Sequence, residues 1–344
     1  MKSQKQGLRP YAIAQHNPAF TQKRCASYKI HIIATPYTLP LHGCCAPFWN
    51  PVSIHSTIIK EMKTSQEYFT SRNHHYVSQC LLRNFDENKA FHIYDKIQNK
   101  FYTKPGPKQL FSDDYLNVSL VNGLKTDIIE QNLNVNFEKD FKYHYESIKN
   151  YIEKRESDIT KSIEYIGRLG VIGEIRNKEY KKKMDKDVLG VFDEIKNVSA
   201  PNNKNDIQDN LDSMSELRYK LSLDFVSFAN DVFKNMGDWE YNIFLTSSDM
   251  YFFLPDCTSI LQRFKINEYF NPNCLDIGEI GMPIDSHTFI NIISKKVRTN
   301  NFKIVQIDEN KLFQINHRLL ASAKCAIVCA NENFLKGTIS KMIC

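Results

Sequence analysis

The chain has 344 residues, with 42% apolar and 24% charged side chains, which is typical of a folded globular protein rather than a disordered one. It contains no run of about 18 consecutive apolar residues, so the sequence predicts no membrane-spanning helix. Residues 1–61 hold seven basic residues and one acidic residue, and this 7 − 1 = +6 is the whole net charge. The 38 basic and 38 acidic residues from Met62 onward cancel, which gives no support for a nucleic-acid surface on the folded part.

Residues 1–61 differ from the rest of the chain. They hold six of the 12 prolines and sustain neither helical nor alternating apolar periodicity, whereas Met62 reads as a fresh translation start. We therefore expect residues 1–61 to come from a mistaken upstream start, with a disordered arm or a targeting peptide as alternatives. Residues 62–344 are expected to form a single α+β domain. The nine cysteines include no Cys-x-x-Cys pair that would indicate a zinc site, and their odd number without a signal peptide predicts reduced thiols and a cytoplasmic protein.

Alternating and helical patterns divide the remaining chain. Residues 90–95 and 101–103 flank a polar turn and predict a β-hairpin. Apolar residues at three- and four-residue steps from Asp127 predict a helix of about 28 residues. Within a second helix, Gly170 and Gly173 suggest close helix–helix contact or a kink. The other predicted elements are that second helix at 159–183, a loop at 198–212, a third helix at 214–236, strands at 241–246, 251–254, 279–284, 288–293 and 326–329, and a helix at 311–323.

The order of these elements indicates the fold class. Strands come first, then long helices, then strands and a helix, which argues for an α+β fold. We expect a long-helix bundle packed against a small antiparallel sheet. Pairing of the early hairpin with the late strands would give one core and separate pairing would give two, and the sequence does not decide between them.

The stretch from His75 to Phe85 reads His-Tyr-Val-Ser-Gln-Cys-Leu-Leu-Arg-Asn-Phe. It resembles the opening motif of the family called domain of unknown function 4238, which is His-Tyr-Val-Pro-Gln, two apolar positions and Leu-Arg-Asn-Phe. Ser78 departs from that pattern, because the family has proline there.

Further segments resemble the family in the same order along the chain. They are Ile93-Tyr94-Asp95, Ile129-Glu130, Arg176-Asn177, Leu245-Thr246-Ser247-Ser248-Asp249, Met282-Pro283 and Ile315-Asn316. The resemblance begins just after Met62, which agrees with a late start of the folded part. Because the family has no agreed activity, the resemblance implies an uncharacterised protein and no particular reaction.

The candidate catalytic residues are His75, Gln79 and Asp249. A histidine titrates near neutral pH and can move protons or bind a metal, and an aspartate in the turn after a strand can orient it or share the metal. Gln79 lies one turn beyond His75 if this segment is helical, hence on the same face. Together they would suit hydrolysis of a phosphodiester or an amide. The structural alternative is that His75 donates to a backbone carbonyl and that Asp249 caps its turn.

The candidate substrate-binding residues are Arg83, Arg176 and Asn316. The arginines could hold an anionic substrate through bidentate hydrogen bonds, although ion pairs are their commoner fate, and an asparagine such as Asn316 more often caps a helix. His74 is expected to be exposed, and Lys181 is expected on a solvated helix face. No cofactor is evident, because phosphate-loop, dinucleotide and zinc-helix motifs are absent. A divalent metal stays open, with unknown ligands.

Two functions follow from these residues. One is a hydrolase of nuclease-like type, with a site built from the His75 motif and the Asp249 turn. The other is a non-catalytic interaction or sensing protein whose long helices bind a protein partner. Convergence of His75, Gln79 and Asp249 in an open pocket would favour the enzyme, and their separation would favour the scaffold.

Overall fold

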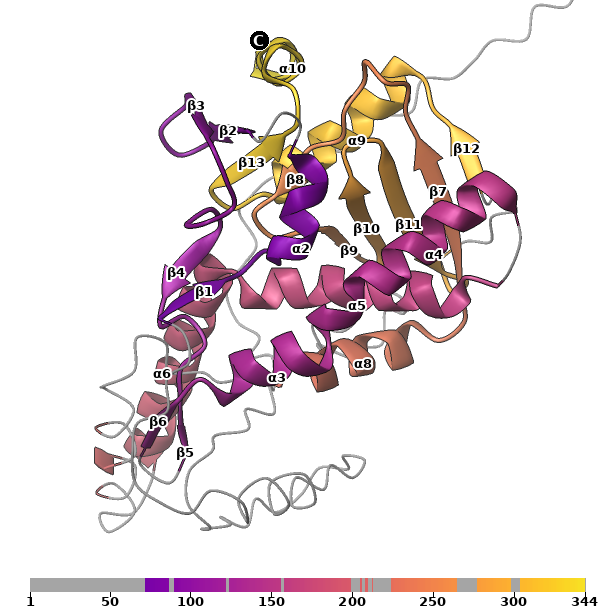
Figure 1. Ribbon diagram of the computed structural model, residues 1–344. Coiled ribbons are helices and arrows are strands. Elements are labelled where there is room, and N and C mark those ends of the chain that lie inside the picture. Colours follow the sequence, from indigo (N-terminus) through magenta and orange to yellow (C-terminus); the bar gives the residue numbers. More distant parts are fainter. Residues whose placement is uncertain are drawn as a thin grey trace, which may run out of the picture.

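The structure of the protein is a computed structural model (Figure 1). The residues that it describes are 72–86, 90–121, 124–155, 158–198, 224–264, 277–297 and 304–343, with a few single positions between 205 and 212. The predicted upstream segment 1–61 lies outside the described residues. So do most of the loop predicted at 198–212 and the first half of the helix predicted at 214–236.

Two sheets hold most of the described strands. The larger has five strands in the order β12-β7-β11-β10-β9, and the smaller has four in the order β3-β2-β13-β8. Neighbouring strands in both are antiparallel, except that β12 runs parallel to β7. The strands of these sheets are β2 Phe91–Asp95, β3 Lys100–Lys104, β7 Trp239–Leu245, β8 Leu254–Pro255, β9 Ile260–Arg263, β10 Ile277–Asp285, β11 Thr288–Ser294, β12 Ile304–Gln306 and β13 Ala326–Cys329. Two small antiparallel ribbons are β1 Asn73–His75 with β4 Ser112–Asp114, and β5 Ser119–Val121 with β6 Leu124–Thr126.

The predicted hairpin is present and pairs with a strand near the other end of the chain. β2 and β3 are antiparallel, and β2 also pairs with β13, where Ile93 lies opposite Val328 and Tyr94 opposite Ile327. Successive side chains of a strand point to opposite faces. Ile93 and Val328 therefore enter one hydrophobic core, and Tyr94 and Ile327 enter a second core on the other face. The early hairpin and a late strand thus share one sheet.

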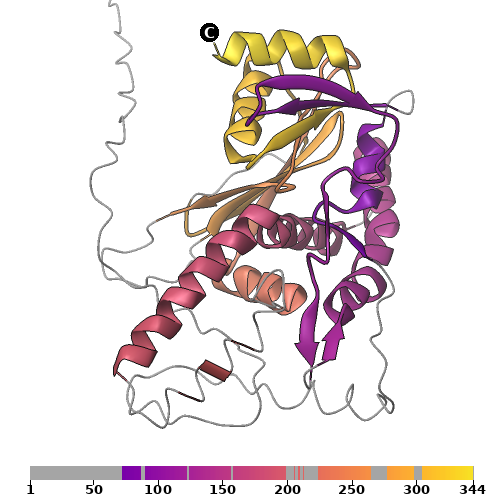
Figure 2. The same ribbon diagram turned by 90° about the vertical axis from the view of Figure 1, so that its left-hand side faces the viewer.

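The helices cover both faces of the five-stranded sheet. α5 and α8 pack together on one face, with α5 against β10, while α9 lies on the other face (Figure 1). α10 lies across the four-stranded sheet, as the turned view shows (Figure 2). The helices are α2 Gln79–Leu82, α3 Ile128–Asn136, α4 Phe141–Lys154, α5 Thr160–Arg176, α6 Lys178–Val198, α8 Phe225–Met236, α9 Glu309–Ser322 and α10 Glu332–Ile343, with 3-10 turns η1 Arg83–Phe85 and η2 Glu138–Asp140.

The predicted bundle of long helices against a small sheet is wrong. The structure is α+β, but its described helices are short and its β-structure is divided among several sheets. The expected 28-residue helix is interrupted at Phe137, whose ring is buried and stacks on Tyr165 at 4.6 Å. The second expected helix is interrupted at Asn177, which is extended, with φ −60° and ψ 136°. Apolar periodicity continues across both breaks, so the pattern alone predicts unbroken helices.

Asn177 shows why the second helix has to end. Its side-chain amide donates to the carbonyl of Asp256 at 2.9 Å, and its side-chain oxygen accepts from the amide of Glu179 at 2.9 Å. The residue therefore caps the start of α6 while it binds the turn before β9. The first of these interactions depends on a segment 79 residues away in sequence, whereas the second is local. No helix in the described part of the chain is both long enough and apolar enough to cross a membrane.

The glycines of α5 allow a helix to approach the sheet. A side chain on Gly170 would meet Ser259 and Ile280, and one on Gly173 would meet the side chain of Thr258. Thr258 has little freedom to move, because its backbone is in the left-handed region at φ 69° and its amide is bound to Pro255. The close contact is therefore between α5 and the sheet with its preceding turn.

Substitution of Gly173 tests this contact. We expect Gly173→Ala to lower the free energy of unfolding by about 1–3 kcal/mol, because the added methyl group overlaps Thr258. Gly337→Ala in α10 is the matched control, because no atom lies within 4 Å of its new methyl group. There the better helix propensity should raise stability by about 0.5–1 kcal/mol. Urea denaturation measures both, and equal effects of the two substitutions would contradict the packing.

Candidate functional site

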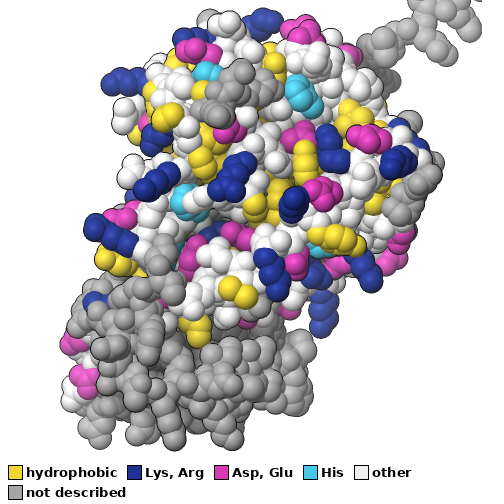
Figure 3. Space-filling view, viewed as in Figure 1, with side chains coloured by type: hydrophobic (Ala, Val, Ile, Leu, Met, Phe, Trp, Pro, Cys, Tyr) yellow, Lys and Arg dark blue, Asp and Glu magenta, His cyan; other side chains and the backbone are white. Residues whose placement is uncertain are grey.

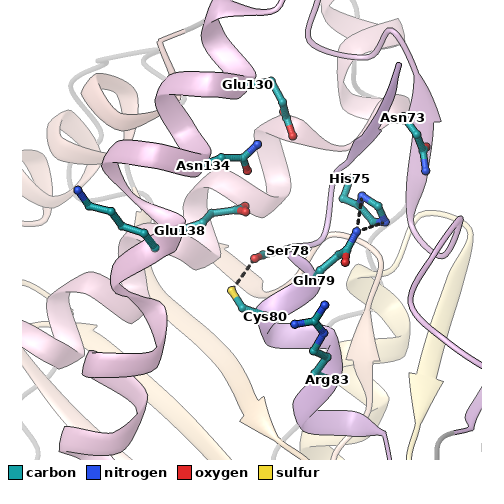
Figure 4. Close-up of a pocket in the computed structure, with 10 residues that line it drawn as sticks. Asn73, His75, Ser78, Gln79, Cys80, Arg83, Glu130, Asn134 and Glu138 are labelled. Atoms are coloured by element: carbon teal, nitrogen blue, oxygen red, sulfur yellow. Dashed lines mark hydrogen bonds between the residues drawn. The ribbon is translucent and has the colours of Figure 1, made fainter. Parts of the chain in front are cut away.

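A polar pocket of about 400 Å³ lies between two segments of the chain (Figure 4). One wall is β1 with α2, and the other is α3 with η2. The residues that line it are Asn73, His75, Ser78, Gln79, Cys80, Arg83, Glu130, Asn134, Glu138 and Lys139. All of these side chains carry a polar or ionisable group.

The sequence of the first wall explains its shape. Leu81, Leu82 and Phe85 are fully buried and fix α2 and η1 in the core. His75, Gln79 and Arg83 follow at steps of four, so the short helix turns the last two toward the side that His75 occupies (Figure 4). The family-like motif therefore separates its residues into an anchoring face and a pocket face.

Asn84 joins this wall to the large sheet. Its side-chain amide donates to the carbonyl of Ile284 in β10 at 2.9 Å. The pocket face of the motif is thereby fixed relative to the five-stranded sheet, although the two segments are 200 residues apart.

The second wall repeats the same spacing. Glu130, Asn134 and Glu138 lie four residues apart, and Figure 4 shows them projecting from α3 and η2 toward the first wall. Side chains at this spacing share one face of a helix. The sequence contains this spacing, but polar residues at such positions are also typical of the solvent-exposed face of a helix, so it does not single out either glutamate as a site residue.

Behind the second wall lies a buried charge cluster centred on Arg176. Only 1% of the surface of Arg176 is exposed. Its guanidinium binds Glu130 at 2.7 Å and Glu138 at 2.6 Å. The second carboxylate oxygen of Glu130 accepts from the side-chain amide of Asn117 at 2.5 Å. Burial by itself would raise the pKa of Glu130, but the adjacent guanidinium and hydrogen bonds hold it below its ordinary value. The cluster therefore presents ionised carboxylates to the pocket.

His75 is the titratable group best placed for proton transfer. It is half-buried, and burial lowers the pKa of its imidazole, with the nearby Arg176 acting in the same direction and the carbonyl of Pro107 opposing. Nε2 lies 3.3 Å from that carbonyl, and the amide nitrogen of Gln79 lies 3.2 Å from Nε2 and 3.3 Å from Nδ1. A proton on Nε2 satisfies the carbonyl and leaves Nδ1 to accept from Gln79. At neutral pH the ring can therefore accept a proton.

Cys80 does not supply a nucleophile. Burial raises the pKa of its thiol to about 11, and its sulfur lies 2.8 Å from the hydroxyl of Ser78. The reactive form of a cysteine is the thiolate, which is scarce at neutral pH for such a group.

The structure brings only some of the predicted site residues together. His75, Gln79 and Arg83 line the pocket, and Arg176 contacts its carboxylates from behind. Asp249 does not line it; this residue is exposed in the turn after β7, where its carboxylate accepts from Ser247.

Asn316 also lies away from the pocket and has backbone partners. It is buried in α9, accepts from the amide of Phe253 at 3.0 Å and donates to the carbonyl of Tyr251 at 2.8 Å. These two hydrogen bonds fix the segment before β8 against the helix. The predicted helix at 311–323 is thus present as α9, and its asparagine supports the fold.

Two basic residues beside the cluster were expected to be solvated and are buried. His74 has no exposed surface, and its Nδ1 accepts from the backbone amide of Asn117 at 2.9 Å. Lys181 donates to the carbonyl of Leu116 at 2.8 Å, and burial lowers its pKa to about 7. A lysine within a Lys-Lys-Lys run gives no sequence signal of burial, because only contact with another segment removes it from water.

The site contains residue types that bind metals, but they do not form a ligand set. Within the described ranges, no group of three or more His, Cys, Asp or Glu side chains could hold a metal ion. The carboxylates of Glu130 and Glu138 are instead bound to Arg176.

Comparison with known proteins identifies the family. A family model described as "Protein of unknown function (DUF4238)" matches residues 73–333. The chain belongs to this family. The match includes both walls of the pocket and confirms the family that the sequence resembles. Ser78, which stands where the family pattern has proline, has φ −56°, a value that proline also adopts. No curated protein matches the chain, and no solved structure matches it.

Removal of the central guanidinium tests the buried cluster. Arg176→Met should lower the free energy of unfolding at pH 7 by about 3–5 kcal/mol, because it leaves two carboxylates without their counter-ion. Arg72→Met is the matched control: its ion pair with Asp114 is exposed, so the loss should be at most about 1 kcal/mol.

The pH dependence of this difference gives a second readout. Since the folded pKa of Glu130 is lowered, the stability from its pairing is complete above its ordinary value of 4.5 and is lost as the pH falls through the lower folded pKa. The difference in the free energy of unfolding between the wild-type protein and Arg176→Met should therefore decrease as the pH falls from about 7 to 3. Urea denaturation across that range measures it, and a constant gap would contradict the assignment.

Proposed function

We propose that this protein is a hydrolase of phosphodiesters and that the pocket around His75 is its catalytic centre. The site rests on His75 and Gln79 without Asp249, whose separation from the pocket by itself favours the non-catalytic alternative. One observation carries the proposal: an imidazole that is neutral at physiological pH lies in an open polar pocket with a side-chain amide against its ring nitrogens. Histidine is the commonest general base in enzymes, and His75 can act as one once the Gln79 amide, which is in contact with its ring nitrogens, gives way to water. The family itself assigns no activity.

His75 is the catalytic base in this proposal. It takes a proton from water, the hydroxide attacks phosphorus, and the bond from phosphorus to the leaving oxygen breaks as the imidazolium returns the proton to that oxygen. Gln79 marks the position of the water, because its amide nitrogen lies 3.2–3.3 Å from both ring nitrogens. A water that enters there exchanges places with the amide, which then orients it.

The charges at the pocket favour an anionic substrate over a neutral amide. Glu130 and Glu138 contribute −2, while Arg83, Lys139 and the buried Arg176 contribute +3, so the sum is +1 with His75 neutral. Arg176 neutralises the carboxylates of Glu130 and Glu138 from behind the second wall. The exposed guanidinium of Arg83 is therefore available to a substrate. A guanidinium there can bind two oxygens of a phosphate and stabilise the charge that develops in the transition state.

Turnover of small phosphodiesters tests the proposal. We expect the full chain to hydrolyse bis(4-nitrophenyl) phosphate, and His75→Ala to lower kcat/KM by about 100-fold or more. Activity should rise with pH through the lowered pKa of His75, below 6.5, and be level near neutrality, because only the neutral ring accepts a proton. His317→Ala, an exposed histidine of α9, is the matched control and should retain activity.

The assay should include phosphomonoesters, carboxylic esters and amides, each with EDTA and with added Mg²⁺ or Mn²⁺. Thermal unfolding of both variants separates loss of activity from loss of fold. No turnover in any of these arms, or an equal loss in His317→Ala, would leave the pocket as a non-catalytic binding site and sink the proposal.

A further inference from the structure

The exposed edge of the four-stranded sheet carries a combination of side chains that the proposed reaction does not use. β3 is the edge strand, and its residues are exposed apart from the half-buried Lys104 (Figures 1 and 2). Its register against β2 places Lys100, Tyr102 and Lys104 on one face. Alternate residues along a strand are about 6.5–7 Å apart, so a cation stands on each side of the tyrosine ring.

The charge of this region departs from that of the chain as a whole. Residues 96–108 contain four lysines and no acidic residue. Lys96 is directed inward, where it donates to the carbonyls of Leu320 and Ala323 at 2.7 and 2.6 Å. The remaining three lysines, at positions 100, 104 and 108, leave a local positive charge that the overall balance of zero conceals. Figure 3 shows lysine and arginine side chains on this side of the molecule, with aspartate and glutamate side chains among them.

One acidic group beside the strand offsets part of this charge. Asp95 lies opposite Lys100 in the hairpin, and one of its carboxylate oxygens accepts from the amides of Ile97 and Gln98 at 2.9 Å each. The three outward lysines and this carboxylate sum to 3 − 1 = +2. The amine of Lys104 donates to the carbonyl of Gln109 at 3.3 Å. Both contacts shape the turns at the two ends of β3.

An aromatic ring accompanies the lysines. Tyr102 shares their face and is 40% exposed, whereas Phe101, which is 37% exposed, points to the opposite face, where its ring lies 5.0 Å from that of Tyr94. Lysines on an edge strand also serve to prevent pairing with other chains, but that role does not call for an exposed ring between them. Cations on both sides of an exposed ring are a combination that binds single-stranded nucleic acid, because phosphates bind the cations and a base stacks on the ring.

The strand also leads directly to the pocket. The loop after β3 brings the carbonyl of Pro107 to 3.3 Å from Nε2 of His75, and the carbonyl of Phe111 accepts from the amide of Tyr76 at 2.8 Å. Seven residues separate Lys100 from Pro107, which span at most about 23 Å. A strand of a few nucleotides is long enough to follow this path.

We propose that β3 and the loop to Pro107 form a binding track for single-stranded nucleic acid that ends at the His75 pocket. The track is defined by Lys100, Tyr102, Lys104 and Lys108. Its role in delivering a phosphodiester rests on the proposed function, whereas binding along the track does not. The pocket then receives one phosphate of a chain whose neighbouring nucleotides lie on the strand.

Fluorescence anisotropy with labelled single-stranded DNA and RNA of about 12 nucleotides tests the track, in the full chain carrying His75→Ala so that the probe is not cleaved. The double variant Lys100→Glu/Lys104→Glu should weaken binding about tenfold or more and reduce its salt dependence. Tyr102→Ala should weaken it about 5- to 100-fold, the range for loss of one stacked base. The control is Lys142→Glu/Lys182→Glu, two exposed lysines of α4 and α6, which should leave binding within about twofold of the parent.

The outcomes separate the two proposals. Binding that needs the track residues supports the track, and if no substrate is then cleaved by the unsubstituted chain, only the hydrolase is overturned. Cleavage of the small phosphodiester without oligonucleotide binding at low salt keeps the hydrolase and overturns the track. Equal losses in the control variant, or equal affinity for duplex DNA, also overturn it. Binding of an acidic peptide that oligonucleotides do not displace would show a peptide-pairing edge instead.

Discussion

Arg176 has to keep its charge at a position where 1% of its surface reaches water. Taking a guanidinium and two carboxylates out of water is costly, and their attraction offsets this cost only when all the contacts are made. Glu130 and Glu138 therefore have to stay at 2.7 and 2.6 Å from it, which fixes α3 and η2 against the end of α5. This constraint builds one wall of the pocket.

Asn177, the residue after Arg176, connects this cluster to the rest of the fold. Asn177 donates to the carbonyl of Asp256, and the carboxylate of Asp256 accepts from the amides of Lys324 and Cys325 at 2.7 and 2.8 Å. Those amides lie just before β13, the strand that pairs with β2. A chain of buried polar contacts therefore joins the pocket wall to the hairpin that carries the proposed track. The pocket and the track are held by one framework, although they are built from separate segments.

Much of the local structure could be predicted from the sequence. The hairpin, β7, the β10–β11 pair, α9 and β13 follow from patterns of a few adjacent residues, because strand alternation and turn residues act over short distances. His75, Gln79 and Arg83 line the same pocket, although His75 lies in β1 and not on the helix that the sequence argument assumed for it. The lengths of the helices could not be predicted. The helices break at Phe137 and Asn177, which contact Tyr165 and Asp256 much later in the chain. Apolar periodicity contains no information about such contacts.

The sequence by itself determined the family, the α+β class and one wall of the candidate site, since these depend on contiguous residues. Only the tertiary structure decided that Glu130 and Glu138 form the facing wall, that Arg176 neutralises them from behind, and that Asp249 lies in an exposed turn that does not line the pocket. It also decided that His74 and Lys181 are buried. The physical reason is that the charge state and accessibility of a polar side chain are set by whatever packs against it, and the chain supplies those neighbours from distant positions.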